Sequence, residues 1–420
     1  MTALTGRPSY RSALRSRAFR LLLTGHGIGT IAQLMLTLAL GIEVFERTGS
    51  GWWLSVTVAL GFVPYVLASG YAGLLADRYS RSAVLTLTFL ARAGCAAVLV
   101  SGLLVHWPVP LLVGVAALAA VLATPSYPAL AAATAQCVPD EQLPPANALV
   151  TGVENAGWMA GPGVLGLILL AGSGPTSATA LAAALFLAAA ALSGRVRLAR
   201  PDGAPTADGL LWPELVAGLH AVSRVAAVRR PMTVAVIDNF LYGYLVVAMV
   251  LVAQDSFGPA GVGMLTSAAA LGGVLALLPV ALLAARIRPA GLLMAAMSTF
   301  AVAVLLVGLS GWAWLSAGLV FAAGGASLLA EVTAVTLLQR AAPPDLTARV
   351  FGVYDQLNVG ALAVGSLVAG PLAEALGPGR AMVLLAGVCL VGAAVATGRL
   401  REPRRRGRHA RPRPRVRPRS

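Results

Sequence analysis

Six ionisable side chains lie inside long apolar stretches of the sequence, where a charge is costly. They are Glu43, Arg92, Glu154, Asp238, Glu331 and Asp355. An ionised side chain at the depth of a bilayer costs about 2.5 to 3.5 kcal/mol on insertion scales, so these residues are functional candidates. Crowded carboxylates in a medium of low dielectric constant bind protons readily, which is the chemistry that a proton exchanger requires.

The apolar stretches are the dominant feature of the chain. Of its 420 residues, 58% are hydrophobic and 11% are charged, against about 25% charged in an ordinary soluble domain. Stretches of about 20 apolar residues, the length that a helix needs to cross the hydrocarbon, follow one another with short polar breaks. The sequence therefore predicts an all-α membrane protein of about twelve transmembrane helices, near residues 19–45, 52–76, 83–105, 109–134, 147–171, 176–198, 231–254, 261–285, 290–309, 312–338, 348–376 and 380–399.

The basic residues indicate an orientation and exclude one energy source. All 31 are arginine, and those between the predicted spans fall mostly in alternate loops that share a side with both termini. Because basic residues accumulate in cytoplasmic loops, both termini are predicted to be cytoplasmic. Without lysine there is no phosphate-binding loop of the kind that ends in Lys, the usual ATP site of a pump, so we expect a gradient to supply the energy.

An internal repeat divides the chain into two halves. Pro139-Asp140 and then Gly152-Val153 recur as Pro344-Asp345 and Gly352-Val353, at an offset of about 200 residues. We expect an N-terminal six-helix half (1–198), a cytoplasmic linker (199–230) with an amphipathic helix at 210–225, a C-terminal six-helix half (231–400) and a disordered Arg/Pro-rich cytoplasmic tail (401–420). The tail has no aromatic residue to stack on a base, so we expect it to face anionic lipid rather than nucleic acid.

The break between the second and third predicted spans carries a recognisable loop. It reads Gly73-Leu-Leu-Ala-Asp77-Arg78-Tyr-Ser-Arg81 and resembles the loop signature of the major facilitator superfamily. Gly73 permits close approach of a neighbouring helix, and Asp77 can form switchable ion pairs with Arg78 and Arg81 at the cytoplasmic seam between the halves. The chain departs from the fuller pattern at positions 80 and 82, where serines replace a glycine and a basic residue.

The resemblance covers most of the chain. In the order seen in the branch similar to enterobactin exporters and related drug-efflux permeases, the sequence has Phe19-Arg-Leu-Leu-Leu, Arg47-Thr-Gly-Ser, the Asp77 loop, Pro139-Asp140, Ala146-Asn-Ala-Leu149, Gly161-Pro162, Arg349-Val-Phe-Gly and Gly370-Pro-Leu372. This resemblance implies the major facilitator fold, in which the first, fourth, seventh and tenth spans line a central cavity.

The fifth predicted span resembles the glycine-proline signature of drug/proton antiporters in that superfamily. Gly157 and Gly161 are four residues apart and let a neighbouring backbone pack closely, while Pro162 bends the helix, which suits a rocking joint. Generic helix packing is the alternative, because uptake carriers use the same residue types, but the spacing of the small residues favours export. The fourth span lacks the arginine that those antiporters usually carry, which weakens the case for proton coupling by that route.

By the same resemblance, Asp238 and Glu331 are the best candidates for a proton or cationic-substrate site in the cavity. Tyr242 follows Asp238 by one helical turn and can share its face. The alternative, which the sequence supports equally for this pair, is that the two acids face cytoplasmic water or cap arginines at the loop ends.

We expect different roles for the remaining ionisable residues in the spans. Glu154 and Asp355 lie at nearly matching places in the repeat, and at 1.5 Å per residue they sit about 10 Å inside the cytoplasmic edge. We expect them to face water and keep them as secondary candidates. Glu43 lies near the outer end of the first span and is a further proton-site or substrate-site candidate. Arg92 is expected to make a structural bond with a neighbouring polar group, and His26 to be a packed, neutral histidine.

These features favour a secondary active transporter in the plasma membrane of a bacterium. We expect it to export a small amphipathic molecule such as a drug, siderophore or secondary metabolite, by proton antiport with alternating access. A gradient-driven importer on the same fold, or a scaffold or sensor that transports nothing, are the alternatives. No enzyme motif is present, the three cysteines have no paired spacing, and neither a metal nor a cofactor is expected. The oligomeric state has no signature here, and a monomer is compatible with the sequence.

Overall fold

The computed structural model describes residues 10–65, 79–198, 226–342 and 347–398, and the predicted 210–225 helix and the tail lie outside them. Within these ranges the regular secondary structure is entirely helical. The helices are α1 (Tyr10–Ala13), α2 (Arg17–Thr48), α3 (Gly51–Leu60), α5 (Arg81–Leu104), α6 (Val109–Ala123), α7 (Ser126–Cys137), the short 3-10 helix η1 (Asp140–Gln142), α8 (Leu143–Leu170), α9 (Pro175–Gly194), α11 (Ala226–Ser256), α12 (Gly258–Arg286), α13 (Pro289–Leu309), α14 (Ala313–Ala341), α15 (Thr347–Leu376) and α16 (Pro378–Gly398).

Ten helical segments of the described residues are long and apolar enough to cross a membrane. The other two predicted spans are not among these ten segments. The second begins as α3 and runs into residues outside the described ranges, and the eighth is α12, within which Gly261–Ala276 is a shorter apolar helix. The predicted fold class, an all-α protein with many membrane-spanning helices, is therefore confirmed.

Local sequence signals set the ends of the first long helix. The Ser16 side-chain oxygen accepts a hydrogen bond from the Phe19 N–H at 3.2 Å, which caps the start of α2. Gly49 follows the last residue of α2 with a φ of 63°, and its N–H donates to the Phe45 carbonyl at 2.8 Å. A left-handed residue that ends a helix in this way favours glycine, because glycine has no Cβ to clash.

The fourth predicted span is not one continuous helix. The span predicted near 109–134 consists of two helices, because the structure ends α6 at Ala123 and starts α7 at Ser126. Pro125 lies at the break, where its missing N–H and its ring disfavour a continuous helix. The predicted span is confirmed, since the two helices together form one candidate crossing from Val109 to Cys137.

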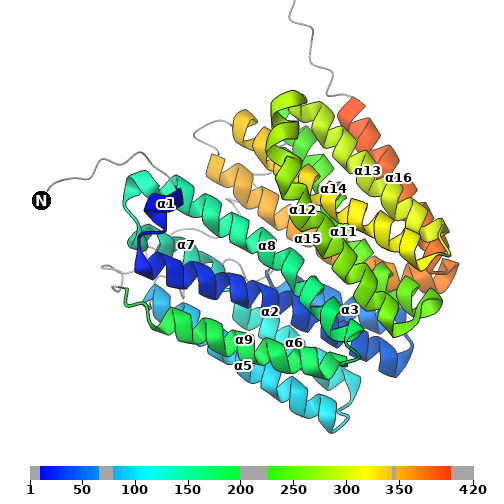
Figure 1. The fold of residues 1–420 in the computed structure, drawn as a ribbon, viewed down its shortest axis with the longest axis horizontal. Coiled ribbons are helices and arrows are strands. Elements are labelled where there is room, and N and C mark those ends of the chain that lie inside the picture. The colour runs from blue at the N-terminus through cyan, green and yellow to red at the C-terminus, as the bar shows by residue number, and fades with distance from the viewer. Residues whose placement is uncertain (1–9, 66–78, 199–225, 343–346, 399–420) are drawn as a thin grey trace, which may run out of the picture.

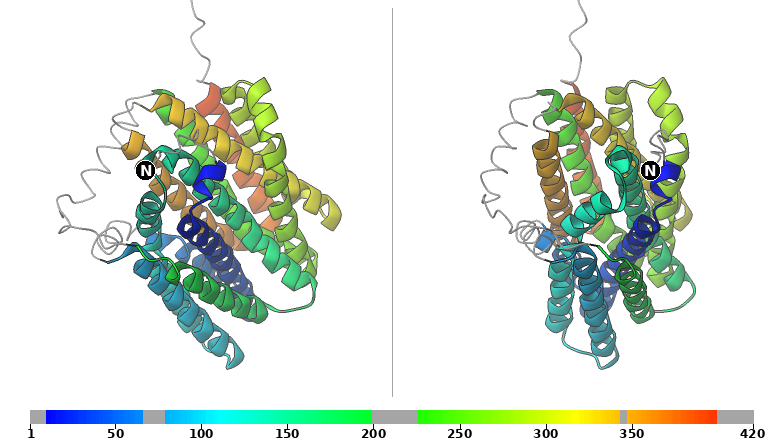
Figure 2. Two further views of the ribbon diagram at one scale, coloured as in Figure 1. Left: turned by 60° about the vertical axis from the view of Figure 1, so that its left-hand side comes forward. Right: turned by 90° about the vertical axis from the view of Figure 1, so that its left-hand side faces the viewer.

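The helices form two bundles that lie side by side. Helices α2 to α9 pack against one another, and so do helices α11 to α16. Figure 1 shows the first bundle, coloured from blue to green, beside the second, coloured from yellow-green to red, and the two views in Figure 2 agree with this arrangement. The interface between the bundles is made chiefly by α8 along α12 and by α3 along α15.

The two bundles touch at backbone level at one end of this interface. A Cβ built on Gly51 of α3 would lie 3.0 Å from the Cα of Gly370 on α15. The Gly370 N–H donates to the Ser55 hydroxyl at 2.7 Å, and the Glu374 carboxylate accepts from the Trp52 N–H at 3.1 Å. We call this contact between α3 and the last two turns of α15 the outer seal, since the arginine distribution predicts that this end faces outside.

Candidate functional site

Asp238 is buried in the C-terminal half, and none of the described ion pairs gives it a cation. Its side chain lies on α11 and is 2% exposed. One carboxylate oxygen accepts a hydrogen bond from the Ser327 hydroxyl of α14 at 2.9 Å, while Oδ1 has no hydrogen-bond partner in the described part of the chain. Transfer of a carboxylate from water to an apolar interior is costly unless the charge is paired. The residue is therefore suited to hold a proton or to meet a cation.

Glu331 lies one turn after Ser327 on α14 and faces the same region. It accepts a hydrogen bond from the Asn239 amide of α11 at 3.2 Å and another from the Tyr354 hydroxyl of α15. The described ion pairs involve neither Glu331 nor Asp238. The predicted pair is thus brought together by neutral donors from three helices, and the described residues give it no positive charge.

Close helix packing positions Tyr354 for this contact. Gly243 of α11 lies against the Leu362 backbone of α15, where a Cβ would have no room. The Ser366 hydroxyl of α15 donates to the Gly243 carbonyl at 3.0 Å. Because glycine lets the two backbones meet, the turn that carries Tyr354 is drawn next to the acids of the neighbouring helices. Tyr242 lies on the same α11, half-buried and close enough to Asp238 to interact with its charge.

A second polar group lies in the N-terminal half. Glu154 of α8 has its Oε2 3.9 Å from His26 Nε2 of α2. The Tyr127 ring of α7 meets His26 edge-on, with centroids 6.2 Å apart, and the Tyr65 ring is 5.0 Å from that of Tyr127. Tyr65 also lies within hydrogen-bonding reach of Asp355 on α15. In the described part of the chain the secondary candidates Glu154 and Asp355 therefore lie beside histidine and tyrosine, and not beside arginine.

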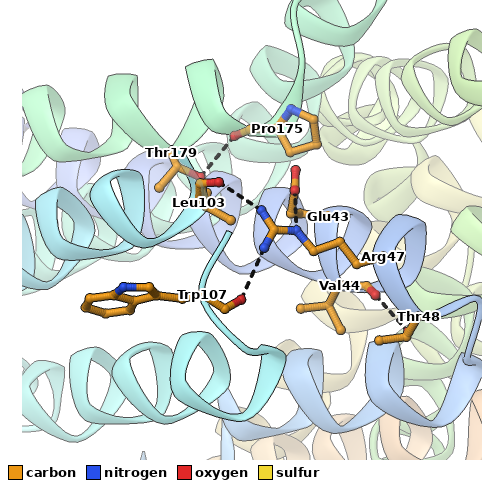
Figure 3. Close-up of polar contacts among 8 residues, drawn as sticks. All are labelled: Glu43, Val44, Arg47, Thr48, Leu103, Trp107, Pro175 and Thr179. Carbon is orange, nitrogen blue, oxygen red and sulfur yellow. Dashed lines mark hydrogen bonds and ion pairs between the residues drawn. The ribbon is translucent and has the colours of Figure 1, made fainter. Parts of the chain in front are cut away.

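Glu43 lies outside both groups, in an ion pair (Figure 3). The Arg47 Nε donates to the Glu43 carboxylate at 2.7 Å. The same guanidinium donates to the carbonyls of Leu103 at 3.0 Å and Trp107 at 3.2 Å. It thereby joins the end of α2 to the end of α5, where helix carbonyls lack partners within the helix. A proton or substrate role for Glu43 stays a prediction, and this geometry supports a structural role.

Arg92 makes the structural bond that the sequence predicts. Its guanidinium is buried on α5 and donates to the Gln33 side-chain oxygen of α2. The charge also lies 4.2 Å from the centre of the Phe186 ring of α9, in a cation–π contact. The arginine therefore joins three helices of the N-terminal half.

The glycines of α8 contact two different neighbours. A Cβ on Gly157 would lie 2.9 Å from Thr30, and one on Gly161 would lie 2.9 Å from the Ile31 carbonyl, so both pack on α2. A Cβ on Gly166 would lie 2.5 Å from the Gly263 carbonyl of α12, in the other half. Pro162 lies inside α8 without interrupting it. The signature thus supports packing within a half and across the interface, and a rocking joint stays a prediction.

Most of the Asp77 loop lies outside the described residues. Gly73, Asp77 and Arg78 belong to that part, whereas Arg81 begins α5, whose first turn is capped by Ser80. The switchable ion pairs of this loop stay a prediction. No group of three metal-ligating side chains occurs in the described ranges.

Sequence reasoning missed the neutral partners of the acids. Ser327, Asn239 and Tyr354 hold Asp238 and Glu331, while Tyr65 and Tyr127 accompany the second group. The only local signals were polar side chains inside apolar spans: Ser327 four residues before Glu331, and Asn239 directly after Asp238.

Comparison with known proteins agrees with these features. The family model of transmembrane secretion effectors matches residues 9–418. An uncharacterized MFS-type transporter of Sinorhizobium fredii is 29% identical over 405 residues, 93% of this chain and 96% of the relative. The enterobactin exporter EntS of Salmonella typhimurium is 28% identical over 374 residues, 86% and 87% of the two chains. Macrolide efflux protein A of Streptococcus pyogenes is 28% identical over 145 residues, 34% and 36% of the two.

Solved structures show the same fold. The nucleoside transporter NupG superposes with a TM-score of 0.68 at 14% identity, covering 91% of this chain and all 100% of that one. An inward-facing bacterial homologue of the lysosomal transporter Spinster gives 0.71 at 13% identity, covering 93% and 97%. The chain therefore belongs to the transmembrane secretion effector family of major facilitator transporters, and it is a multi-pass protein of the bacterial plasma membrane and not an enzyme.

Proposed function

We propose that this protein exports a small amphipathic molecule from the cytoplasm in exchange for protons. Its relatives include an enterobactin exporter and a macrolide efflux protein, which supports export as the direction and amphipathic compounds as the cargo. The cytoplasmic orientation of both termini and the contact of residues 401–420 with anionic lipid are parts of this proposal.

The observation that carries the proposal is the Asp238–Glu331 pair. Both acids lie in membrane-spanning helices, Asp238 is nearly inaccessible, and no cation is paired with either in the described ranges. With neutral donors alone, a second negative charge in this space is disfavoured by repulsion and by desolvation. A proton removes that cost, so proton binding and release at the pair can bias which conformation the transporter adopts.

The packing of the halves supports alternating access. The outer seal closes the predicted outer end of the interface between α3 and α15, and α8 packs closely on α12 through Gly166 and Gly263. In this conformation Asp238 is nearly inaccessible, so exposure of the two acids toward the cytoplasm would require opening at the predicted inner end. Rotation of one half against the other that opens the outer seal would expose the acids to the outside.

Transport by an Asp238→Asn variant tests the proposal. Inverted vesicles from cells without their own efflux pumps would be energised with a pH gradient, acid inside, and offered erythromycin or enterobactin. We expect gradient-driven accumulation in the wild type and its loss in Asp238→Asn, with equal amounts of protein in the membrane. Glu141→Gln, at an exposed acid of η1, is the control and should transport normally.

Two results would contradict the proposal in different ways. Undiminished accumulation in Asp238→Asn would show that Asp238 does not couple proton movement to substrate movement. If the wild type neither accumulated either compound nor protected cells from a panel of amphipathic compounds, an importer or a scaffold would replace the exporter.

A further inference from the structure

His26 has an unused ring nitrogen in the interior of the N-terminal half. The residue is 8% exposed, and its Nε2 makes no hydrogen bond within the described residues. The Glu154 carboxylate lies 3.9 Å from that nitrogen. A packed, neutral histidine would be expected to use a buried nitrogen in a hydrogen bond. Here the nitrogen instead faces the Glu154 carboxylate, at a distance near the upper limit for an ion pair.

Helix packing holds the two residues in register. Gly157 of α8 contacts Thr30 of α2, and these positions lie three residues after Glu154 and four residues after His26. Both helices run in the same direction from the predicted cytoplasmic end, so residues one turn before the contact face one another. The Gly157 contact thus places the carboxylate and the imidazole side by side.

The neighbouring helices add few other charges around His26. Glu154 comes from α8 and Tyr127 from α7, and the Tyr65 ring after α3 lies against Tyr127. Helix α9 has no titratable side chain from Pro175 to Gly194. From α5, Arg92 binds Gln33, about two turns further along α2. Within the described ranges, His26 and Glu154 are therefore the one acid–imidazole pair at this level.

The pair is connected to the other half of the protein. Asp355 of α15 lies within hydrogen-bonding reach of Tyr65 and is close enough to feel the charge of Glu154. Asp355 and Glu154 therefore lie near enough across the interface between the halves for their charges to interact. If both are ionised, they repel each other, and a cation beside one of them reduces that repulsion.

We propose that His26 and Glu154 form a second proton-binding site, whose charge state controls how closely the two halves approach at the Glu154–Asp355 level. A proton taken up on His26 Nε2 gives an imidazolium paired with Glu154, so that Asp355 faces a neutral pair. Loss of that proton leaves two facing carboxylates and separates the halves at this level. Imidazole is suited to this task, because it changes charge between about pH 5 and 8. The inference deepens the proposed proton exchange and rests on it.

Histidine NMR tests proton binding without any substrate. The chain has four histidines, so protein labelled with 13C at the imidazole Cε1 and placed in lipid nanodiscs should give four signals, and the His26→Gln variant assigns one of them. We expect the position of the His26 signal to depend on pH, and this dependence to differ in Glu154→Gln, because the carboxylate no longer faces the imidazole. The signal of exposed His106 is the control, and it should behave identically in the wild type and in Glu154→Gln.

Distance measurements test the coupling between the halves. Spin labels at Glu141→Cys and Gln339→Cys report the separation of the predicted inner ends. We expect the ends to approach as the pH falls in the wild type, and this response to be lost in both His26→Gln and Glu154→Gln. Should His26→Gln fail to fold, His26→Asn and Glu154→Gln carry the test.

The outcomes separate this inference from the exporter proposal. A His26 signal that stays fixed over the whole pH range, or one that moves identically in Glu154→Gln, would overturn the site. A pH response of the inner ends that persists without His26 would overturn the coupling. Asp238→Asn should abolish flux while leaving the His26 signal unchanged, so loss of one result leaves the other standing.

Discussion

The outer seal offers a test of how tightly the two halves must fit. A Cβ on Gly370 would clash with the Gly51 carbonyl of α3, so α3 and α15 cannot keep their separation in a Gly370→Ala variant. Forcing a methyl group into such a contact typically costs about 1 to 3 kcal/mol. Only the conformation closed at the outer end has this contact, so the whole cost falls on that conformation.

The expected effect is a population shift. An energy difference of about 1 to 3 kcal/mol changes the equilibrium between the closed and open outer ends by about 5- to 150-fold. Spin labels at Ser173→Cys and Gly311→Cys, in loops at the predicted outer ends of the two halves, would report this shift by pulsed electron resonance. The background would carry alanine in place of the three native cysteines. We expect a longer distance to gain population in Gly370→Ala.

The same helix provides a matched control. A Cβ on Gly360 of α15 meets nothing within 4 Å. The Gly360→Ala variant therefore gains the same helix propensity, about 1 kcal/mol, without the clash. Glu374→Ala should fall between them, because it removes hydrogen bonds from Ser50 and Trp52 in an exposed place, each worth about 0.5 to 1.5 kcal/mol. A distance distribution in Gly370→Ala that matches Gly360→Ala would refute the reasoning.

Two further predictions concern the structural charges. Arg92→Leu leaves the half-buried Gln33 oxygen without its donor and should lower the free energy of unfolding by about 1 to 3 kcal/mol. The change would be measured as a lower Tm in detergent, and exposed Arg288→Gln should change the Tm little. Arg47→Gln should destabilise the protein because Glu43 loses its partner, and a second change, Glu43→Gln, should recover part of that loss. If Glu43→Gln alone abolished flux at an unchanged Tm, Glu43 would instead be a transport residue.

Hydropathy and charge pattern determined much of the architecture before any contact was known. The lengths of the apolar stretches predict the spans because crossing the hydrocarbon sets a minimum helix length. Asp238 and Glu331 could be identified as candidates from the sequence, because an ionisable residue within an apolar stretch is rare and costly. The Glu43–Arg47 pair was also readable, because a spacing of four residues places two side chains on one face of a helix.

Only the tertiary structure decided which polar side chains meet. Tyr354 reaches Glu331 because Gly243 lets α11 and α15 touch, and Glu154 reaches His26 because Gly157 sets the register of α8 on α2. These contacts depend on how each helix is rotated and how far it slides along its neighbour. Hydrophobic pattern carries little of that information, because the apolar surface of a membrane helix can face lipid or protein at similar cost.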